Sequence, residues 1–229
     1  MKFQIVNCVE LGFGKSQKRR EEKERVKMSR VRPILSKGLK AVEDLNLLKI
    51  LHSEINHELS SNRFQGNQGG PLEGFEVEYD APQSQDVVLR KKCESGEEVA
   101  VSALLGPETY AREGVYPRGV LMKVCVRKPG LSSILQFDCA VTEEQSSSEF
   151  YIQNAYYLQS SSCPRPSAYR GPIFCTLDPQ LQDSLNEYLL ARGIGEKLTN
   201  FLLLHLHKKE LDQYVNWLRT LVSLVEKDS

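Results

Sequence analysis

Two histidines near the C-terminus are the first residues of this sequence whose types and spacing could serve chemistry. His205 and His207 stand two apart in a stretch whose apolar pattern predicts a helix. Residues two apart on a helix point about 200° away from each other, so they cannot share a metal ion. Helical metal ligands are spaced by four residues instead. The pattern therefore predicts two surface histidines, with no metal site and no cofactor.

The six cysteines do not form a recognisable reactive or disulfide-bonded set. They lie at positions 8, 93, 125, 139, 163 and 175 and contain no Cys-x-x-Cys pair. Cys125 and Cys139 alternate with apolar residues, as small core side chains do. Cys163 and Cys175 lie in or near a Pro-rich loop, without an adjacent base to favour the thiolate. We expect free thiols in a reducing compartment and no catalytic cysteine.

Paired acids and a glycine-rich stretch are equally weak as signs of an enzyme. Glu97-Glu98 and Glu143-Glu144 lie on predicted strands or beside turns, where neighbours face opposite sides, and one acid of each pair is expected to be solvated. The stretch "LGFGKS" (11–16) lacks the spacing and the following helix of a phosphate-binding GxxxxGK[ST] loop. We therefore expect no catalytic residue.

The elements that would position any site begin with a helix over residues 41–59. Its apolar residues alternate spacings of four and three, which is typical of a coiled-coil seam. The seam residues are Ala41, Leu45, Leu48, His52, Ile55 and Leu59, with His52 as a tolerated polar member and Leu47 and Leu51 widening the stripe. Gly and Asn residues in 60–70 end this helix.

Between residues 73 and 158 the apolar period changes from about 3.6 to two, which predicts strands. Six segments show it: 75–80, 86–93, 97–105, 119–128, 133–141 and 149–158. The short links and the turn residues between them predict an antiparallel meander of about seven strands. Because the strands alternate apolar and polar residues, one face of the sheet must be covered, and only helices remain to cover it. The fold class is therefore α+β.

Two helices follow the strands and meet at an abrupt turn. Asp178 is placed as the N-cap of the first helix, and Pro179 occupies its first position. Gly193 supplies the left-handed residue that ends this helix, and Arg192 lies near the negative end of the helix dipole. The second helix restarts after Ile194 and runs over about 196–226.

The long last helix needs a partner, because a single helix of about 30 residues does not offset its own ordering entropy. Its seam residues are Leu211, Tyr214, Leu218, Leu221 and Val225. We expect them to form a coiled coil with Leu45, Leu48 and Ile55 over one side of the sheet. Trp217 and Leu224 lie on another side of the helix and are interpreted as an oligomer interface, with simple packing on the sheet as the alternative.

The net charge of zero conceals a strong asymmetry. Residues 1–40 hold 12 Lys and Arg against 4 Asp and Glu, a balance of +8, whereas residues 41–229 have a balance of −8. We interpret 1–40 as a basic leader, either a transit peptide or a disordered segment, and 41–229 as one domain. A plain basic tail and a nucleic-acid-binding arm are the alternatives. Translation could begin at Met1 or Met28, and no run is long and apolar enough to span a membrane.

The C-terminal residues resemble the mitochondrial glycoprotein family. The similarity rests on Leu177-Asp178, Leu181, Leu185, Tyr188-Leu189, the "ARGI" of 191–194, Leu198, Phe201-Leu202, Lys209-Glu210, Tyr214, Trp217-Leu218, Leu221 and Val225, with "FEVEY" (75–79) as a weaker continuation. It covers about residues 41–226. The family commonly has long acidic runs between strands, whereas "GPETYAREGVYPRG" (106–119) and "TEEQSSSE" (142–149) are short and only mildly acidic.

The resemblance implies a strongly twisted antiparallel sheet of about seven strands, flanked by one N-terminal and two C-terminal helices, in a doughnut-shaped homotrimer. It also implies a non-enzymatic protein of the mitochondrial matrix that supports oxidative phosphorylation or mitochondrial translation by binding other proteins, often basic ones, as an adaptor or chaperone-like scaffold. The alternative function is that of a nucleic-acid-associated protein using the basic N-terminal segment. The alternative locations are another organelle, the nucleus or the cytoplasm.

Overall fold

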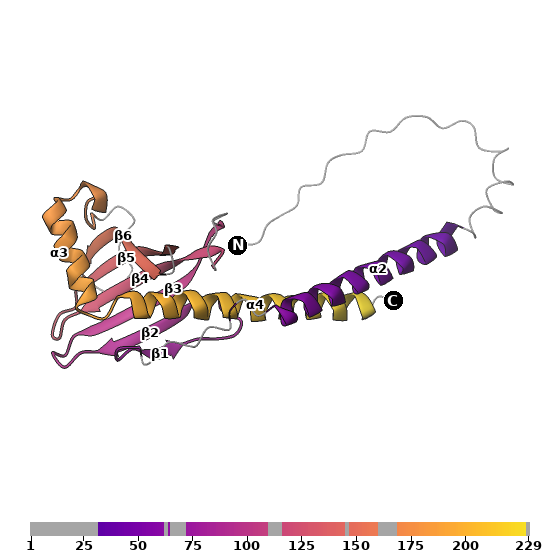
Figure 1. The fold of residues 1–229 in the computed structure, drawn as a ribbon, viewed down its shortest axis with the longest axis horizontal. Coiled ribbons are helices and arrows are strands. Elements are labelled where there is room, and N and C mark those ends of the chain that lie inside the picture. The colour runs from indigo at the N-terminus through magenta and orange to yellow at the C-terminus, as the bar shows by residue number, and fades with distance from the viewer. Residues whose placement is uncertain are drawn as a thin grey trace, which may run out of the picture.

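The computed structural model describes residues 32–61, 64, 72–109, 116–144, 147–159 and 169–227. The expected leader lies almost wholly outside these residues, as do the "LGFGKS" stretch and Cys163. Within the described part of the chain, a sheet and three long helices make up the fold (Figure 1).

One antiparallel sheet runs in strict sequence order, so each strand pairs with its neighbours in the chain. Its strands are β1 (Glu76–Tyr79), β2 (Val87–Lys92), β3 (Glu98–Thr109), β4 (Arg118–Arg127), β5 (Ile134–Glu144) and β6 (Ser147–Leu158). All six expected segments form strands, and the described sheet has six strands where about seven were expected. Gly96 and Gly130, both with positive φ, make the turns after β2 and β4.

The alternation along each strand gives the sheet one apolar and one mixed face. The apolar face contributes Val87, Leu89, Val99, Val101, Val120, Met122, Val124, Val126, Phe137, Cys139 and Val141, all almost fully buried. Two C-terminal helices cover this face: α3 (Pro179–Leu190), preceded by the 3-10 turn η1 (Phe174–Thr176), and α4 (Glu196–Lys227). They add Leu189, Ile194, Leu198, Leu202, Leu203 and Leu206 to the same core.

Only the first part of α4 lies on the sheet. Its second part runs past the sheet, and α2 (Arg32–Ser60) lies beside it in the antiparallel direction (Figure 1). The two chain ends therefore pair. The expectation that the paired helices would lie over the sheet is wrong, because the pair projects beyond the sheet. We call this projection, residues 42–60 and 211–227, the arm. α2 also begins earlier than the expected residue 41.

The boundaries of the C-terminal helices agree closely with those expected from the sequence, since both depend on local capping signals. None of the helices in the described part of the chain is long and apolar enough to cross a membrane.

Candidate functional site

A small apolar cluster holds the arm together. Its buried members are Leu51, Ile55, Val215, Leu218 and Val222, and Leu48, Leu211 and Leu221 pack against them partly exposed. At the border of the cluster, the Tyr214 hydroxyl donates a hydrogen bond of 3.1 Å to the Glu54 carboxylate. This bond shows that Glu54 and Tyr214 lie on the same side of the helix pair.

Most of the residues assigned to the coiled-coil seam lie in or beside this cluster, but three described positions of α2 do not. Leu59 is one of them and is 58 % exposed. Leu45 is 57 % exposed, and His52 is exposed with its Nδ1 bonded to the Leu48 carbonyl oxygen. Leu51 occupies the buried place instead of His52. Spacings of four and three fit either residue, and Leu51 is buried because an imidazole there would need a buried partner. Val225 is partly buried and Tyr214 is exposed at the border.

Trp217 and Leu224, the two residues interpreted as an oligomer interface, are 56 % and 62 % exposed in the single chain. They continue a stripe with Tyr214 and Leu221 at spacings of three, four and three, so the four side chains line one side of α4. The rings of Tyr214 and Trp217 stack with centroids 6.0 Å apart. A large aromatic pair is therefore left facing solvent along the arm.

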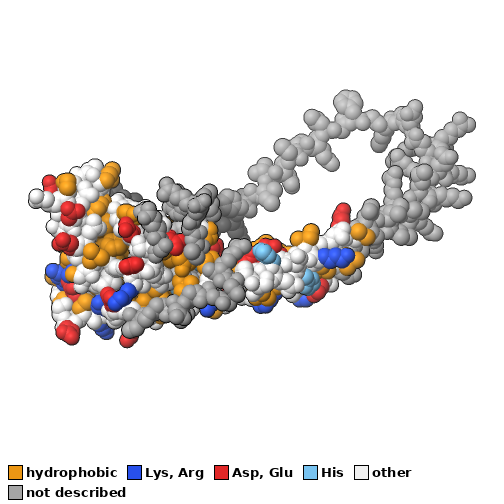
Figure 2. Space-filling model, in the orientation of Figure 1, with side chains coloured by type: hydrophobic (Ala, Val, Ile, Leu, Met, Phe, Trp, Pro, Cys, Tyr) orange, Lys and Arg blue, Asp and Glu red, His pale blue; other side chains and the backbone are white. Residues whose placement is uncertain are grey.

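α2 extends the same stripe. Leu47 and Ile50 precede Glu54 by seven and four residues, so they lie on the side that Glu54 shares with Tyr214. We call the combined set, Leu47, Ile50, Tyr214, Trp217, Leu221 and Leu224, the ridge. Figure 2 shows the arm with exposed hydrophobic side chains among charged ones. An apolar stripe of this size on a projecting arm is typical of a protein-binding surface.

The arm is also acidic on its α2 side. Residues 42–60 contain four acids, Glu43, Asp44, Glu54 and Glu58, against the single base Lys49. The ridge can therefore combine apolar contact with attraction for a basic surface.

The turn between α3 and α4 sets the direction of the arm. The Asp178 carboxylate accepts a hydrogen bond of 3.0 Å from the Gln180 N–H and caps α3. Gly193 has φ +88°, and the Ile194 N–H donates to the Leu189 carbonyl oxygen at 3.1 Å. Leu189 and Ile194 are both fully buried, which completes a Schellman motif with its apolar contact.

Arg192 ties this turn to the sheet. Its guanidinium donates to the Tyr188 carbonyl oxygen at 2.8 Å and to Glu97 Oε1 at 2.9 Å, and it lies 3.3 Å from the centre of the Tyr188 ring. Lys91 of β2 donates to the Arg192 carbonyl oxygen at 3.1 Å. Burial raises the pKa of the Tyr188 hydroxyl, as expected for a ring packed under the turn. The turn is thereby fixed to two strands.

Glu97 and Glu98 differ in their exposure to solvent, since the Glu97 side chain is 12 % exposed and the Glu98 side chain 26 %. Glu97 pairs with Arg192, and Glu98 pairs with Arg127 at 2.5 Å and with Arg90 at 3.5 Å. Neighbours on a strand face opposite sides, and here both sides offer an arginine. Arg127 and Arg192 come from more distant segments, so local pattern could not reveal them.

The two histidines of α4 are not a surface pair. His205 Nε2 donates to Asp80 Oδ2 at 2.8 Å, whereas His207 is buried with its Nδ1 donating to the Leu203 carbonyl oxygen at 2.8 Å. Burial lowers the pKa of His207 and favours its neutral form. As expected, the two point to different places. No group of His, Cys, Asp or Glu in the described residues is arranged to hold a metal ion.

Asp80 joins the β1–β2 loop to α4. Lys209 contacts its carboxylate and also donates to the Asp86 carbonyl oxygen at 2.8 Å. One turn further along α4, Gln213 donates to the carbonyl oxygens of Pro82 and Ser84. His205, Lys209 and Gln213 therefore form a polar stripe, opposite in character to the ridge, that holds the loop.

The described cysteines are free thiols. Cys139 is buried, and its burial raises its pKa to about 12, so it stays a neutral thiol. Cys125 is partly buried, and burial raises its pKa as well. Cys175 is exposed.

Known proteins resemble this chain in sequence and in fold. Residues 51–225 match the model of the mitochondrial glycoprotein family. A mitochondrial acidic protein of Schizosaccharomyces pombe is 35 % identical over 105 residues, which span 42 % of this chain and only 37 % of that protein. An uncharacterised mitochondrial protein of Arabidopsis thaliana is 25 % identical over 221 residues, 87 % of this chain and 84 % of its own length.

Two solved structures share the fold. The p22 protein of Trypanosoma brucei superimposes with a TM-score of 0.62 at 23 % identity, covering 80 % of this chain and 99 % of its own. A Leishmania major protein of unknown function gives a TM-score of 0.61 at 21 % identity, with the same two coverages.

Proposed function

Because the chain belongs to the mitochondrial glycoprotein family, we propose that it is a non-enzymatic, homotrimeric protein-binding scaffold of the mitochondrial matrix. It serves as an adaptor or chaperone-like protein in support of oxidative phosphorylation or mitochondrial translation. The observation that carries this proposal is the ridge, which leaves Trp217 and Leu224 more than half exposed in the single chain. Large aromatic side chains in this state are typical of binding surfaces.

The ridge supports assembly because the two helices of the arm do not bury it by themselves. The two helices use Leu51, Ile55 and Leu218 to hold each other, while Trp217 and Leu224 stay more than half exposed. Burial of an indole and several leucines in a neighbouring copy would remove this apolar surface from water. Assembly of identical chains is the simplest way to achieve that burial.

The charge of residues 41–229 favours basic proteins as partners. Residues 41–229 have a balance of −8, so three copies would carry about −24. Such a field attracts basic proteins at low ionic strength and is screened as salt rises. The partners proposed for the assembled protein are therefore basic proteins.

The assembly is tested by measuring particle mass by light scattering. The wild-type chain is expected to behave as a trimer, and Trp217→Lys is expected to lower the mass about threefold because an ammonium replaces the apolar contact. Leu45→Lys is the matched control, since Leu45 is equally exposed on the arm but lies outside the ridge. A Trp217→Lys protein with unchanged mass would remove the interface assignment.

The location and the leader are tested together by N-terminal sequencing of the protein recovered from isolated mitochondria. Loss of about the first 40 residues is the expected result. Recovery of the chain from another compartment, or with its basic segment intact, would contradict the matrix assignment.

The alternative function rests on the +8 balance of residues 1–40, which suits a nucleic-acid-binding arm. It requires RNA binding that weakens with salt and disappears when residues 1–40 are removed. An absence of RNA binding by the full chain at low salt excludes it.

A further inference from the structure

Three aromatic rings meet where α4 leaves the sheet and enters the arm. His207 lies in α4 shortly before the arm, Phe64 lies shortly after α2, and Tyr116 precedes β4. The centroids of the Phe64 and Tyr116 rings are 5.9 Å apart, and they lie 5.4 Å and 5.0 Å from the centroid of the His207 ring. The three rings, which we call the joint, therefore connect α4, the segment after α2 and the sheet.

The His207 ring is buried, and only one of its two nitrogens has a partner among the described residues. The residue is 1 % exposed, and its Nδ1 donates to the Leu203 carbonyl oxygen at 2.8 Å. Because a carbonyl oxygen only accepts, the proton of the neutral ring is on Nδ1. Nε2 is also buried, and no described residue forms a hydrogen bond with it. A second proton would therefore place a charge and an unpaired N–H donor against the other two rings, which is unfavourable.

The charged groups around the joint are bound to other partners. Glu210 of α4 is ion-paired with Arg118 of β4, and Glu143 of β5 accepts a hydrogen bond of 3.1 Å from the Tyr116 N–H. Burial lowers the pKa of His207 below its ordinary value of 6.5, although its backbone hydrogen bond and the two carboxylates act in the opposite direction. The Tyr116 hydroxyl also stays neutral, because burial raises its pKa. The packed joint therefore favours the uncharged imidazole.

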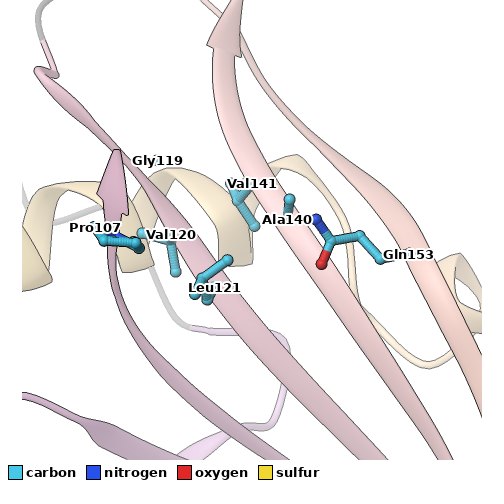
Figure 3. A pocket seen from close by; sticks show the side chains of 8 residues that line it. Pro107, Gly119, Val120, Leu121, Ala140, Val141 and Gln153 are labelled. Atoms are coloured by element: carbon cyan, nitrogen blue, oxygen red, sulfur yellow. The ribbon is translucent and has the colours of Figure 1, made fainter. Parts of the chain in front are cut away.

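Arg118 is held in place by the sheet as well as by Glu210. The pairing of β3 with β4 is irregular near the start of β4. There the Arg118 guanidinium donates to the Gly106 carbonyl oxygen at 2.6 Å and to the Leu105 carbonyl oxygen at 3.3 Å. Figure 3 shows this end of the two strands, where Gly119 follows Arg118 in the chain. Because these bonds hold the guanidinium, Glu210 keeps its partner and is not free to accept from the imidazole.

We propose that the joint is a pH-dependent switch for the arm. With a neutral His207 the three rings stay packed and hold the base of the arm against the sheet. Uptake of a proton at Nε2 favours an open state, in which the Phe64 and Tyr116 rings part from His207 and water reaches the imidazolium. The arm then gains freedom relative to the sheet, while the apolar core of the sheet stays folded.

The direction of the switch follows from the preference of each state for protons. The pKa of His207 is lowered in the closed joint, whereas a hydrated imidazole in the open joint titrates near 6.5. The closed joint is therefore fully favoured above 6.5, and this advantage is lost as the pH falls from 6.5 towards the lower value of the closed joint. Because one proton is taken up, the open fraction rises at most about tenfold for each pH unit in this interval.

Amide hydrogen exchange of the full-length chain tests the switch, with the rates corrected for the intrinsic pH dependence of exchange. From about pH 7.5 to about pH 5.5, residues 42–60 of the wild type are expected to exchange about three- to tenfold faster, while β3–β5 stay protected. His207→Phe keeps an aromatic ring in the joint but cannot take up a proton. It is expected to lose this pH dependence.

Two further variants serve as the control and as a second test. His52→Phe is the matched control, because His52 forms the same Nδ1 bond to the carbonyl oxygen four residues earlier but is exposed. It should keep the pH dependence of the wild type. Phe64→Ala removes one ring at a half-buried position, so it tests the joint even if His207→Phe does not fold. At about pH 7.5 it is expected to exchange as fast in residues 42–60 as the wild type does at about pH 5.5.

Four results would overturn the inference. A pH dependence that persists in His207→Phe would belong to another group. Unchanged exchange of residues 42–60 in the acidified wild type would mean that the joint stays closed. Equal acceleration in β3–β5 would mean that acid unfolds the sheet instead of opening the joint. A Phe64→Ala protein with wild-type exchange at both pH values would mean that this ring does not hold the arm.

Discussion

The Arg192 guanidinium donates a hydrogen bond of 2.9 Å to the Glu97 carboxylate, and so joins the α3–α4 turn to the start of β3. Both side chains are mostly buried, at 16 % and 12 % exposure. Because the turn sets the direction of α4, this ion pair also orients the arm and its ridge relative to the sheet.

Replacement of Arg192 by Met is expected to lower the free energy of unfolding by about 2–4 kcal/mol, since it leaves the Glu97 carboxylate without its charged partner in a mostly buried site. Urea denaturation followed by circular dichroism measures the change. Adding Glu97→Gln to Arg192→Met should cost less than the sum of the two single changes. Glu78→Gln, in an exposed pair with Arg90, is the control and should cost less than about 1 kcal/mol. Additive effects at Arg192 and Glu97 would show that the pair contributes nothing as a unit.

Gly193→Ala should destabilise the α3–α4 turn for two reasons, which are the strained backbone conformation and the close contacts of the added Cβ. Its φ of +88° disfavours a residue with Cβ, and that Cβ would lie 3.1 Å from Lys91 Nζ and 3.4 Å from Phe75 Cε2. The expected loss in the free energy of unfolding is about 2–4 kcal/mol. Gly130→Ala separates the two causes, because Gly130 has φ +75° and open space around it. It should lose only about 1–2 kcal/mol. Equal losses would mean that the packing at Gly193 adds no cost.

The loop held by Asp80 should make stability depend on pH. Burial alone would raise the pKa of Asp80, but the hydrogen bonds and charges of Lys209 and His205 outweigh it and hold the pKa below 3.8. The folded state therefore favours the carboxylate. Its contribution is fully present above 3.8 and is lost as the pH falls through the lower folded value.

Asp80→Asn is accordingly expected to cost about 0.5–1 kcal/mol at pH 6, because solvent screens the exposed carboxylate, and its difference from the wild type should shrink as the pH falls below 3.8. Denaturant unfolding at a series of pH values measures both. Asp212→Asn, an exposed acid on α4, serves as the control and should be nearly neutral throughout. A difference that grows as the pH falls would contradict the assigned direction.

Leu218→Ala should loosen the arm without unfolding the sheet. Leu218 is almost fully buried between α2 and α4, so its truncation is expected to cost about 2–4 kcal/mol of local stability. Amide hydrogen exchange should then rise in residues 42–60 and stay unchanged in β3–β5. Leu45→Ala, at an exposed position of α2, should leave exchange unaltered. Faster exchange throughout the sheet would mean that the arm and the core unfold together.

Several features could be predicted from the sequence because they depend on neighbouring residues only. The period-two segments became strands, and the residues around Asp178 and Gly193 mark where α3 begins and ends. Capping and left-handed turn geometry act within a few residues, so the local sequence contains the whole cause. The pairing of the two chain ends also follows from matching apolar stripes.

Only the tertiary structure decided the contacts between distant segments. Leu51 rather than His52 enters the arm's cluster, His207 is buried while His205 meets Asp80, and Glu97 finds Arg192. Periodicity leaves neighbouring positions nearly equivalent, and the choice between them depends on which polar group finds a partner when remote elements meet. The projection of the arm beyond the sheet has the same origin, since α4 is longer than the face that it covers.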